Sequence, residues 1–268
     1  MVRALRVQFP GALYHVTNRG NERKAIFKDD VDRSEFLRIL SQSISTYGIV
    51  LHSFVLMDNH WHILAQTPLG NLGEFMRHFN ITYTSHYNRR HNRAGHLYQG
   101  RYKSFLVELD SYLSKVSRYI HLNPVQVAGM KKMEAKKRRQ YLFTYKWSSL
   151  PGYIGLKGRW DFVEHDTVLA EYGGDGAAGR RKYRNRIIED LTAGLAIRDQ
   201  IVGQGILAAR GLSPGLGKTS WTRIKIGKGR MSGKSINICP WKRYWKLWKK
   251  KRAPARFCNL PERPARLS

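Results

Sequence analysis

The chain has 268 residues, and a hydrophobic share of 42% is enough to bury one large core or two modest ones. It carries 48 Lys and Arg against 19 Asp and Glu, and the formal net charge of +29 favours a polyanionic partner, above all nucleic acid. The sequence shows no apolar run of membrane-spanning length, no secretory signal and too few cysteines for a disulfide framework, so we expect a cytoplasmic protein with no membrane partner.

The first part of the chain predicts alternating strands and helices. Residues 11–20 alternate in hydrophobicity and end in Asn-Arg-Gly, which is typical of a strand followed by a turn. Residues 29–48 begin with two aspartates, continue with apolar residues at helical spacing and end at Gly48, which predicts a helix. Two apolar runs, 49–57 and 60–66, flank an Asp-Asn pair suited to a tight turn and predict a hairpin.

Another helix, strand and helix follow. Residues 71–91 show apolar residues at helical spacing, and residues 100–110 alternate as a strand. The next helix begins at residue 110, and we expect it to end at Asn123 because Pro124 disfavours helical backbone in the residue before it. This order predicts an α+β fold of the ferredoxin-like split βαβ kind, an antiparallel sheet with helices on one face, followed by a helical and basic C-terminal extension.

A pair of histidines stands at the start of the second strand of the hairpin. In the stretch MDNHWHILA, His60 and His62 are two residues apart, so on a strand both project from one face while Trp61 points to the other. Imidazole is the commonest metal ligand in proteins. An isolated pair of this kind is nevertheless more often two half-exposed histidines, so a metal site needs further ligands.

The helix after the last strand offers further ligands. Tyr119 and Asn123 are four residues apart and therefore lie on one helical face, one with a phenol and the other with an amide oxygen. Two imidazoles and an oxygen suit Mg²⁺ or Mn²⁺ with open positions for phosphate and water. A phenol can then attack a phosphorus whose oxygens a cation polarises. From the residues alone, Tyr119 could equally be a half-buried aromatic that anchors the helix.

Three motifs in this order resemble a known family. They are the His-Trp-His triplet after Asp-Asn, the stretch LYQGRYKS at residues 97–104, and RYIHLNPVQVAG at residues 118–129. Together they resemble the histidine–hydrophobic–histidine (HUH) single-tyrosine transposases, and in particular the REP-associated tyrosine transposases. The match runs over residues 11–129 and more loosely to about residue 205.

The resemblance implies a metal-dependent endonuclease and strand transferase that acts on single-stranded DNA, often folded as a hairpin. His60 and His62 would bind the metal, with Asn123 as third ligand, and Tyr119 would be the nucleophile that becomes joined to the 5′ phosphate. His121 would project elsewhere on the helix and ranks below Asn123. Family members commonly work as dimers, and the resemblance implies a nucleoid-associated protein of the bacterial cytoplasm with Mg²⁺ or Mn²⁺ as cofactor.

Polar and basic residues near these motifs are candidates for a DNA-binding groove. Basic grooves with aromatic platforms hold single strands, and several such residues follow the first strand, end the second helix or lead into the last strand. Each alone could be a solvated surface charge. The candidates are Asn18, Arg19, Arg23, Arg89, Arg90, Gln99, Arg101 and Lys103.

The remainder of the chain divides by composition. We expect a nuclease domain over residues 1–130, a basic connector with a small helical appendage over 131–210, and a basic tail rich in Trp, Lys and Arg over 211–268. The tail shows no convincing period, and its GLGKTS stretch is not a phosphate-binding loop because Leu212 occupies the position of the first glycine.

Two other functions stay open from the sequence. A nickase of the replication-initiator type uses the same histidine pair, although the short chain and single tyrosine helix disfavour the larger relaxases. A DNA-binding regulator could also keep the fold without turnover.

Overall fold

The computed structural model describes residues 8–195, 197, 201–202 and 206–207. The chain forms two units, Met1–Gly215 and Leu216–Ser268, of which the second lies outside the described residues, as does the whole basic tail predicted from residue 211. The first elements are β1 (Ala12–Arg19), η1 (Asn21–Arg23), α1 (Asp30–Tyr47), β2 (Val50–Met57), β3 (His60–Thr67), α2 (Leu72–Arg90), β4 (Lys103–Val107) and α3 (Leu109–Gln126). They are followed by α4 (Ala128–Lys131), α5 (Ala135–Thr144), α6 (Leu150–Tyr153), α7 (Asp166–Leu169), η2 (Ala170–Tyr172), α8 (Ala177–Ala193), β5 (Ile201–Val202) and β6 (Ile206–Leu207).

The sheet has the strand order of the predicted fold. Its strands run β2-β3-β1-β4-β6-β5, and β1 pairs antiparallel with both β3 and β4, while β2 pairs antiparallel with β3. The first four strands with α1 and α2 therefore form the ferredoxin-like split βαβ arrangement, which confirms the predicted α+β class. The short strand β6 extends this sheet by pairing parallel to β4.

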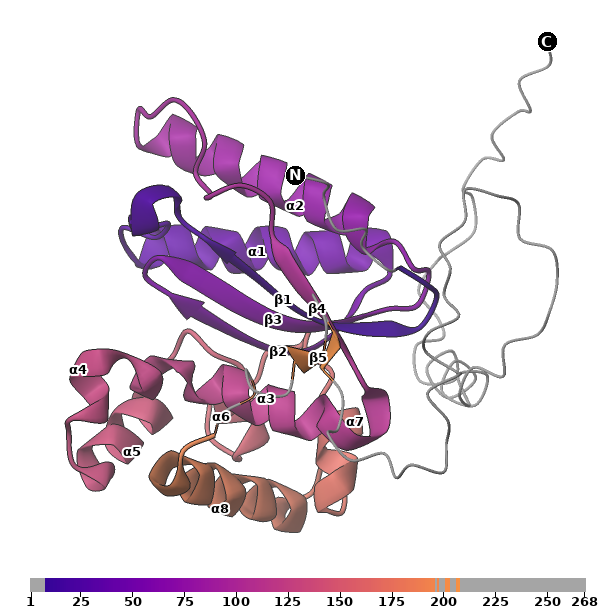
Figure 1. The fold of residues 1–268 in the computed structure, drawn as a ribbon, viewed down its shortest axis with the longest axis vertical. Coiled ribbons are helices and arrows are strands. Elements are labelled where there is room, and N and C mark those ends of the chain that lie inside the picture. Colours follow the sequence, from indigo (N-terminus) through magenta and orange to yellow (C-terminus); the bar gives the residue numbers. More distant parts are fainter. Residues whose placement is uncertain (1–7, 196, 198–200, 203–205, 208–268) are drawn as a thin grey trace, which may run out of the picture. The chain divides into compact units, whose positions relative to one another are not determined.

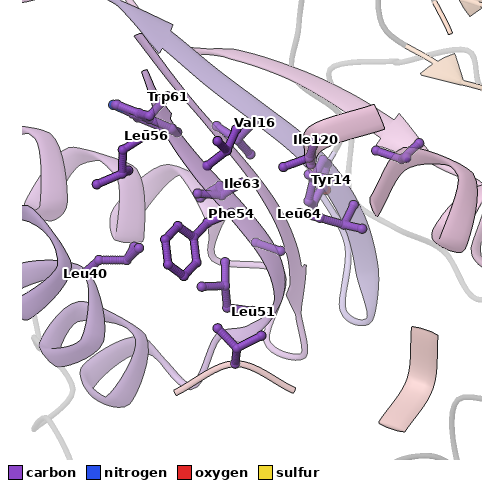
Figure 2. Packing of buried hydrophobic residues seen from close by; sticks show 14 of the residues in the cluster. Tyr14, Val16, Leu40, Leu51, Phe54, Leu56, Trp61, Ile63, Leu64 and Ile120 are labelled. Atoms are coloured by element: carbon purple, nitrogen blue, oxygen red, sulfur yellow. The ribbon is translucent and has the colours of Figure 1, made fainter. Parts of the chain in front are cut away.

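The two faces of the sheet carry different layers (Figure 1). Trp61 on β3 is fully buried and packs against Phe36 of α1 and Phe79 of α2, so these helices cover one face, as predicted. Ile63 continues this apolar face along the strand (Figure 2). His62 points to the other face, where it meets Tyr119 of α3. The sheet thus gains a second layer, made by α3 and the helices after it, that the sequence did not predict.

The end of α3 differs from the prediction. The helix continues through Pro124 to Gln126 rather than ending at Asn123. A proline within a helix has no N–H for the carbonyl four residues earlier, here that of Ile120. The side-chain amide of Asn123 donates to this carbonyl at 3.4 Å and to that of Tyr119 at 2.9 Å, which compensates for the missing donor. The predicted end was wrong because this local hydrogen bonding offsets the proline.

The domain boundary that we place near residue 130 stays a prediction. On its far side, α5, α7 and α8 all contact α3, so the described residues on both sides share packing. No helix within the described residues is both long and apolar enough to cross a membrane.

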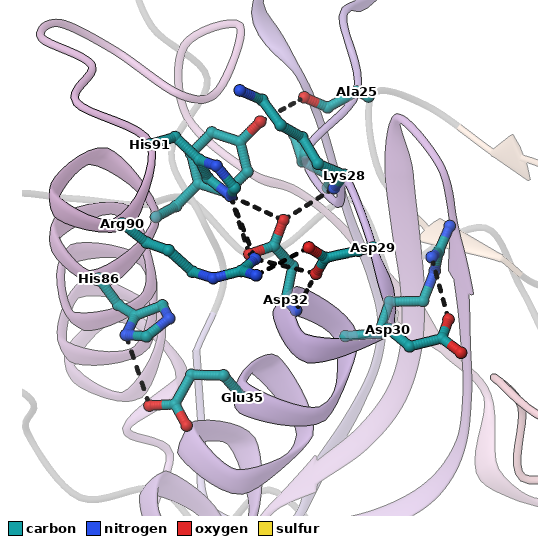
Figure 3. A network of polar contacts seen from close by, with 12 residues as sticks. Ala25, Lys28, Asp29, Asp30, Asp32, Glu35, His86, Arg90 and His91 are labelled. Atoms are coloured by element: carbon teal, nitrogen blue, oxygen red, sulfur yellow. Dashed lines mark hydrogen bonds and ion pairs between the residues drawn. The ribbon is translucent and has the colours of Figure 1, made fainter.

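A buried carboxylate joins α1 to the end of α2 (Figure 3). Asp32 is fully buried, receives the backbone N–H of Lys28 at 2.8 Å and contacts His91 Nε2 through both of its oxygens at 2.9 Å. Arg90 forms ion pairs with Asp32 and with Asp29, the residue that caps α1. Burial alone would raise the pKa of Asp32, but these hydrogen bonds outweigh it and hold the pKa below its ordinary value.

We predict that Asp32→Asn lowers the free energy of unfolding by about 3 kcal/mol at pH 7, because it removes the buried negative charge that faces Arg90 and replaces one of the two acceptor oxygens with an NH2 donor. Since the pKa of Asp32 is lowered in the folded state, its stabilisation is present above about pH 4, the unfolded pKa, and is lost as the pH falls through the folded value. Urea unfolding at pH 7 and at lower pH measures both effects, and the difference from wild type should shrink in acid.

Asp30→Asn is the matched control, because Asp30 pairs with Lys146 at the surface, where solvent screens the ion pair and its loss should change stability little. Wild-type stability of Asp32→Asn at pH 7 would contradict the role given to the buried carboxylate.

Candidate active site

A pocket of about 400 Å³ opens on the α3 side of the sheet, where β1, β3 and β4 meet the middle of α3. It brings together residues far apart in the sequence, and most of them are aromatic, basic or amide side chains. They are His15, Thr17, Asn18, Arg19, His62, Gln99, Arg101, Lys103, Phe105, Tyr119 and Ile197.

The predicted histidine pair lies on one face of β3, with ring centroids 5.1 Å apart. The Nδ1 atom of His60 lies 2.7 Å from Oδ1 of Asn59, and because this oxygen accepts, Nδ1 must carry the proton. Burial and the nearby charge of Arg19 lower the pKa of His60 to about 4, so the ring is neutral at pH 7. Its Nε2 then holds the lone pair that a metal would require.

A third histidine, which the sequence reasoning missed, joins this pair. His15 on β1 stacks on His62 with centroids 5.1 Å apart, and its Nε2 lies 2.9 Å from Nδ1 of His62. Burial lowers the pKa of His15 to about 4, so this ring is also neutral at pH 7. The alternation along residues 11–20 could have indicated this contact. It places His15 on the same face of β1 as Thr17, and Thr17 pairs with His62 of β3.

The hydrogen bond between the two rings decides which nitrogen of His62 can bind a metal. The proton between Nε2 of His15 and Nδ1 of His62 can belong to either ring. If His62 donates from Nδ1, its Nε2 carries the lone pair, as in His60. Proteins usually orient a metal-binding histidine in this way, by a hydrogen bond to the ring nitrogen that does not bind the metal.

Tyr119 reaches the same place from α3. Its ring meets His15 at 5.9 Å and His62 at 6.3 Å between centroids, in both cases edge to face. The side chain is half-buried and lines the pocket. The structure therefore brings together His62 and the tyrosine that lies 57 positions further along the chain.

Asn123, the third predicted metal ligand, lies outside the pocket. It is buried one helical turn beyond Tyr119, its amide nitrogen is committed to the backbone of α3, and it does not line the pocket. Its Oδ1 remains an acceptor that a cation could use. His121 does not line the pocket, and its ring nitrogens contact the hydroxyls of Tyr183 and Ser149.

The predicted DNA-binding residues separate into two groups. Five of them line the pocket: Asn18, Arg19, Gln99, Arg101 and Lys103. Asn18 is buried, whereas the other four are exposed. The remaining three lie elsewhere: Arg23 in η1, and Arg89 and Arg90 at the end of α2, where Arg90 is held by Asp29 and Asp32.

The predicted metal ligands offer two imidazole nitrogens, from His60 and His62, and the amide oxygen of Asn123, which are donor types that Mg²⁺ or Mn²⁺ can accept. Of these three residues, only His62 lines the pocket. Within the described residues, no group of three or more His, Cys, Asp or Glu side chains could hold a metal ion.

Comparison with known proteins finds a similarity over the first part of the chain. Residues 9–123 match the family model described as "Transposase IS200 like". This segment, which is less than half of the chain, is thus similar to IS200-like transposases. It includes the first two of the three motifs and the start of the third.

Two solved structures are also similar to this chain. A REP-associated tyrosine transposase bound to a REP hairpin is 13% identical, with 63% of this chain and 93% of that chain covered and a TM-score of 0.47. A protein of Deinococcus radiodurans R1 assigned as a transposase is 16% identical, with 44% and 95% covered and a TM-score of 0.33. Both TM-scores are low, so the fold assignment rests on the strand order. No curated protein matches the chain.

We predict that His62 carries its proton on Nδ1 at pH 7, because this tautomer directs the N–H to Nε2 of His15 and leaves Nε2 of His62 with the lone pair that a metal requires. Histidine ¹⁵N NMR shifts measure this directly. His15→Gln keeps an acceptor oxygen and should preserve this tautomer, whereas His15→Leu should give a mixture of the two. Protonation of His62 on Nε2 in the wild-type protein would contradict this reading of the ring contact.

Proposed function

We propose that this IS200-like protein is a metal-dependent endonuclease and strand transferase for single-stranded DNA, and that Tyr119 forms a 5′-phosphotyrosyl intermediate. The observation that carries the proposal is the meeting of Tyr119 with His15 and His62 in one pocket lined by cationic side chains. A tyrosine that served only to anchor α3 would need neither the histidines nor the cations around it.

In the proposed reaction the phenol oxygen of Tyr119 attacks the phosphorus of one phosphodiester. The new bond joins tyrosine to the 5′ phosphate, the bond to the 3′ oxygen breaks, and the proton lost by the phenol is balanced by the proton gained by the released 3′-OH. A later attack by a 3′-OH reverses these bonds and rejoins DNA. The ester preserves the phosphodiester bond energy, so no external energy source is required.

His60, His62 and Asn123 would hold the divalent metal, for which we propose Mg²⁺ or Mn²⁺. When bound, it supplies polarisation of the phosphate oxygens and charge compensation during attack. In this proposal His15 and Asn59 hydrogen-bond to the ring nitrogens of His62 and His60 that face away from the metal, and they would hold both rings in the orientation and tautomer that a ligand needs.

The residues at the rim of the pocket favour the proposal of a single-stranded substrate. Arg101 and Lys103 are exposed beside Tyr119, and Phe105 offers an aromatic surface in the same pocket. Cations that follow a backbone and aromatic rings that stack on bases are the common means of binding unpaired strands. We propose hairpin DNA of the REP type as the natural substrate, homodimers as the working form, and the bacterial nucleoid as the place of action.

We predict that the wild-type protein, incubated with Mg²⁺ or Mn²⁺ and labelled hairpin oligonucleotides, forms a covalent adduct visible on a denaturing gel. Tyr119→Phe should abolish the adduct because the nucleophile is removed, and His62→Ala should abolish it because a metal ligand is lost. Tyr141→Phe, which removes the hydroxyl of an exposed tyrosine on α5, is the matched control and should react as wild type.

Tight, salt-sensitive binding of hairpins without any adduct or cleavage would overturn the proposal and favour a non-catalytic DNA-binding protein. An adduct with unpaired replication-origin sequences but with no hairpin would instead favour an initiator-type nickase.

We also predict that Arg101→Ala and Lys103→Ala weaken DNA binding through lost phosphate contacts. In a Tyr119→Phe background, which prevents cleavage, each change should lower affinity and reduce the slope of log affinity against log salt by about one. Fluorescence anisotropy over a salt series measures both. Lys137→Ala on exposed α5 is the control, and equal slopes for all the variants would place the DNA elsewhere.

A further inference from the structure

We infer that α8 positions the nucleophile: Asp190 and Tyr183 hold α3 from the side opposite the sheet, and thereby place the hydroxyl of Tyr119 beside the histidines. This inference rests on the proposed role of Tyr119. It assigns a part in catalysis to a helix that lies beyond the segment matched by the family model, residues 9–123.

A buried polar stripe runs along α3. It consists of Ser114, Ser117, Arg118 and His121, which are spaced three or four residues apart and therefore share one side of the helix. Polar groups buried in this way need partners, because an unpaired one is costly. Their partners come from η2, α8 and the residue before α6, all of them later in the chain.

The strongest contact of the stripe is an ion pair. Arg118 Nε donates to Oδ2 of Asp190 at 2.6 Å, and both side chains are only 8% exposed. Its NH1 group also donates to the hydroxyls of Ser114 at 2.8 Å and Tyr172 at 2.6 Å. A buried guanidinium with fixed donors tolerates little displacement, so the pair fixes the rotation of α3 as well as its position along the axis.

A second contact lies one turn further along α3. The hydroxyl of Tyr183 lies 3.0 Å from that of Ser117 and 2.8 Å from Nδ1 of His121, whose Nε2 lies 2.8 Å from the hydroxyl of Ser149. Burial, with a smaller effect from His165, lowers the pKa of His121 to about 3, so this ring is neutral at pH 7. Tyr183 thus joins α8 to α3 through hydrogen bonds without introducing a charge.

These two contacts flank the nucleophile. Arg118 directly precedes Tyr119, and His121 follows it by two residues. On the sheet side, Tyr119 meets the histidines edge to face at centroid distances near 6 Å, a contact that does not fix α3 along its own axis. The directional restraint therefore comes from hydrogen bonds on the polar stripe, to which α8 contributes the ion pair of Asp190 and the hydroxyl of Tyr183. A small displacement of a reacting group costs a large part of the rate.

The test compares Tyr183→Phe and Asp190→Asn with wild type and with Asn185→Ala, a change at an exposed position of α8. Three quantities are measured on the full chain: the single-turnover rate of adduct formation at saturating hairpin DNA, the affinity for that DNA, and the ¹⁹F NMR signal of fluorotyrosine incorporated at position 119. Tyr183→Phe preserves the ring and its packing, so it stays informative if Asp190→Asn fails to fold.

We expect Tyr183→Phe to lower the rate by about tenfold or more, to leave DNA affinity within about twofold, and to broaden or split the ¹⁹F signal, because a loosened α3 misplaces the hydroxyl. Asn185→Ala should match wild type in all three. A wild-type rate and a wild-type ¹⁹F signal in Tyr183→Phe would overturn the inference, even if the variant melts at a lower temperature.

Failure of the proposed function has a different signature. If wild type forms no adduct, Tyr119 is not the nucleophile, and the ¹⁹F signal alone then decides whether α8 positions this side chain. An altered signal in Tyr183→Phe supports that positioning, and an unaltered one overturns it.

Discussion

Along β3, successive side chains point to opposite faces of the sheet, and this alternation separates the packing of the molecule from its chemistry. Trp61 is buried among the aromatic rings of α1 and α2, while its neighbours His60 and His62 face α3. A shift of register by one residue would bury the histidines in an apolar core and expose the tryptophan. The large apolar contact of Trp61 therefore fixes where the imidazoles stand.

The site depends equally on α3, the helix that packs over the sheet at this point. α3 carries Tyr119 toward the sheet and a polar stripe toward α8, so the helix is restrained on two sides by different forces. Apolar packing against β2 and β3 sets its distance from the sheet, and hydrogen bonds to Asp190 and Tyr183 set its rotation and axial position. Asn123 contributes in a third way, because its amide lets the helix pass Pro124.

Much of this arrangement could be predicted from local patterns. Alternation in residues 11–20, the turn at Asp58-Asn59 and Gly48 at the end of α1 were enough to predict these strands and helices in their order along the chain, because each signal is decided by neighbouring residues. The shared face of His60 and His62 followed from strand geometry alone. The continuation of α3 was mispredicted because the backbone preference of Pro124 was weighed without the side-chain amide beside it.

Other features depend on contacts that local patterns do not encode. His15 joins His62 across 47 positions, and Arg118 meets Asp190 across 72, so each pair exists only once the chain has folded. The polar stripe of α3 also resembles an exposed face in sequence, since Ser, Arg and His are usually at the surface. Its burial could be recognised only when α8 was in place.

The most direct test of the account is to identify the residue that becomes joined to DNA. After reaction with a hairpin oligonucleotide and divalent metal, nuclease and protease digestion followed by tandem mass spectrometry locates the nucleotide on one peptide. The account predicts a phosphodiester linkage on Tyr119 through the 5′ phosphate. A nucleotide on another residue, or cleavage that leaves only free 5′ phosphate and unmodified Tyr119, would contradict it.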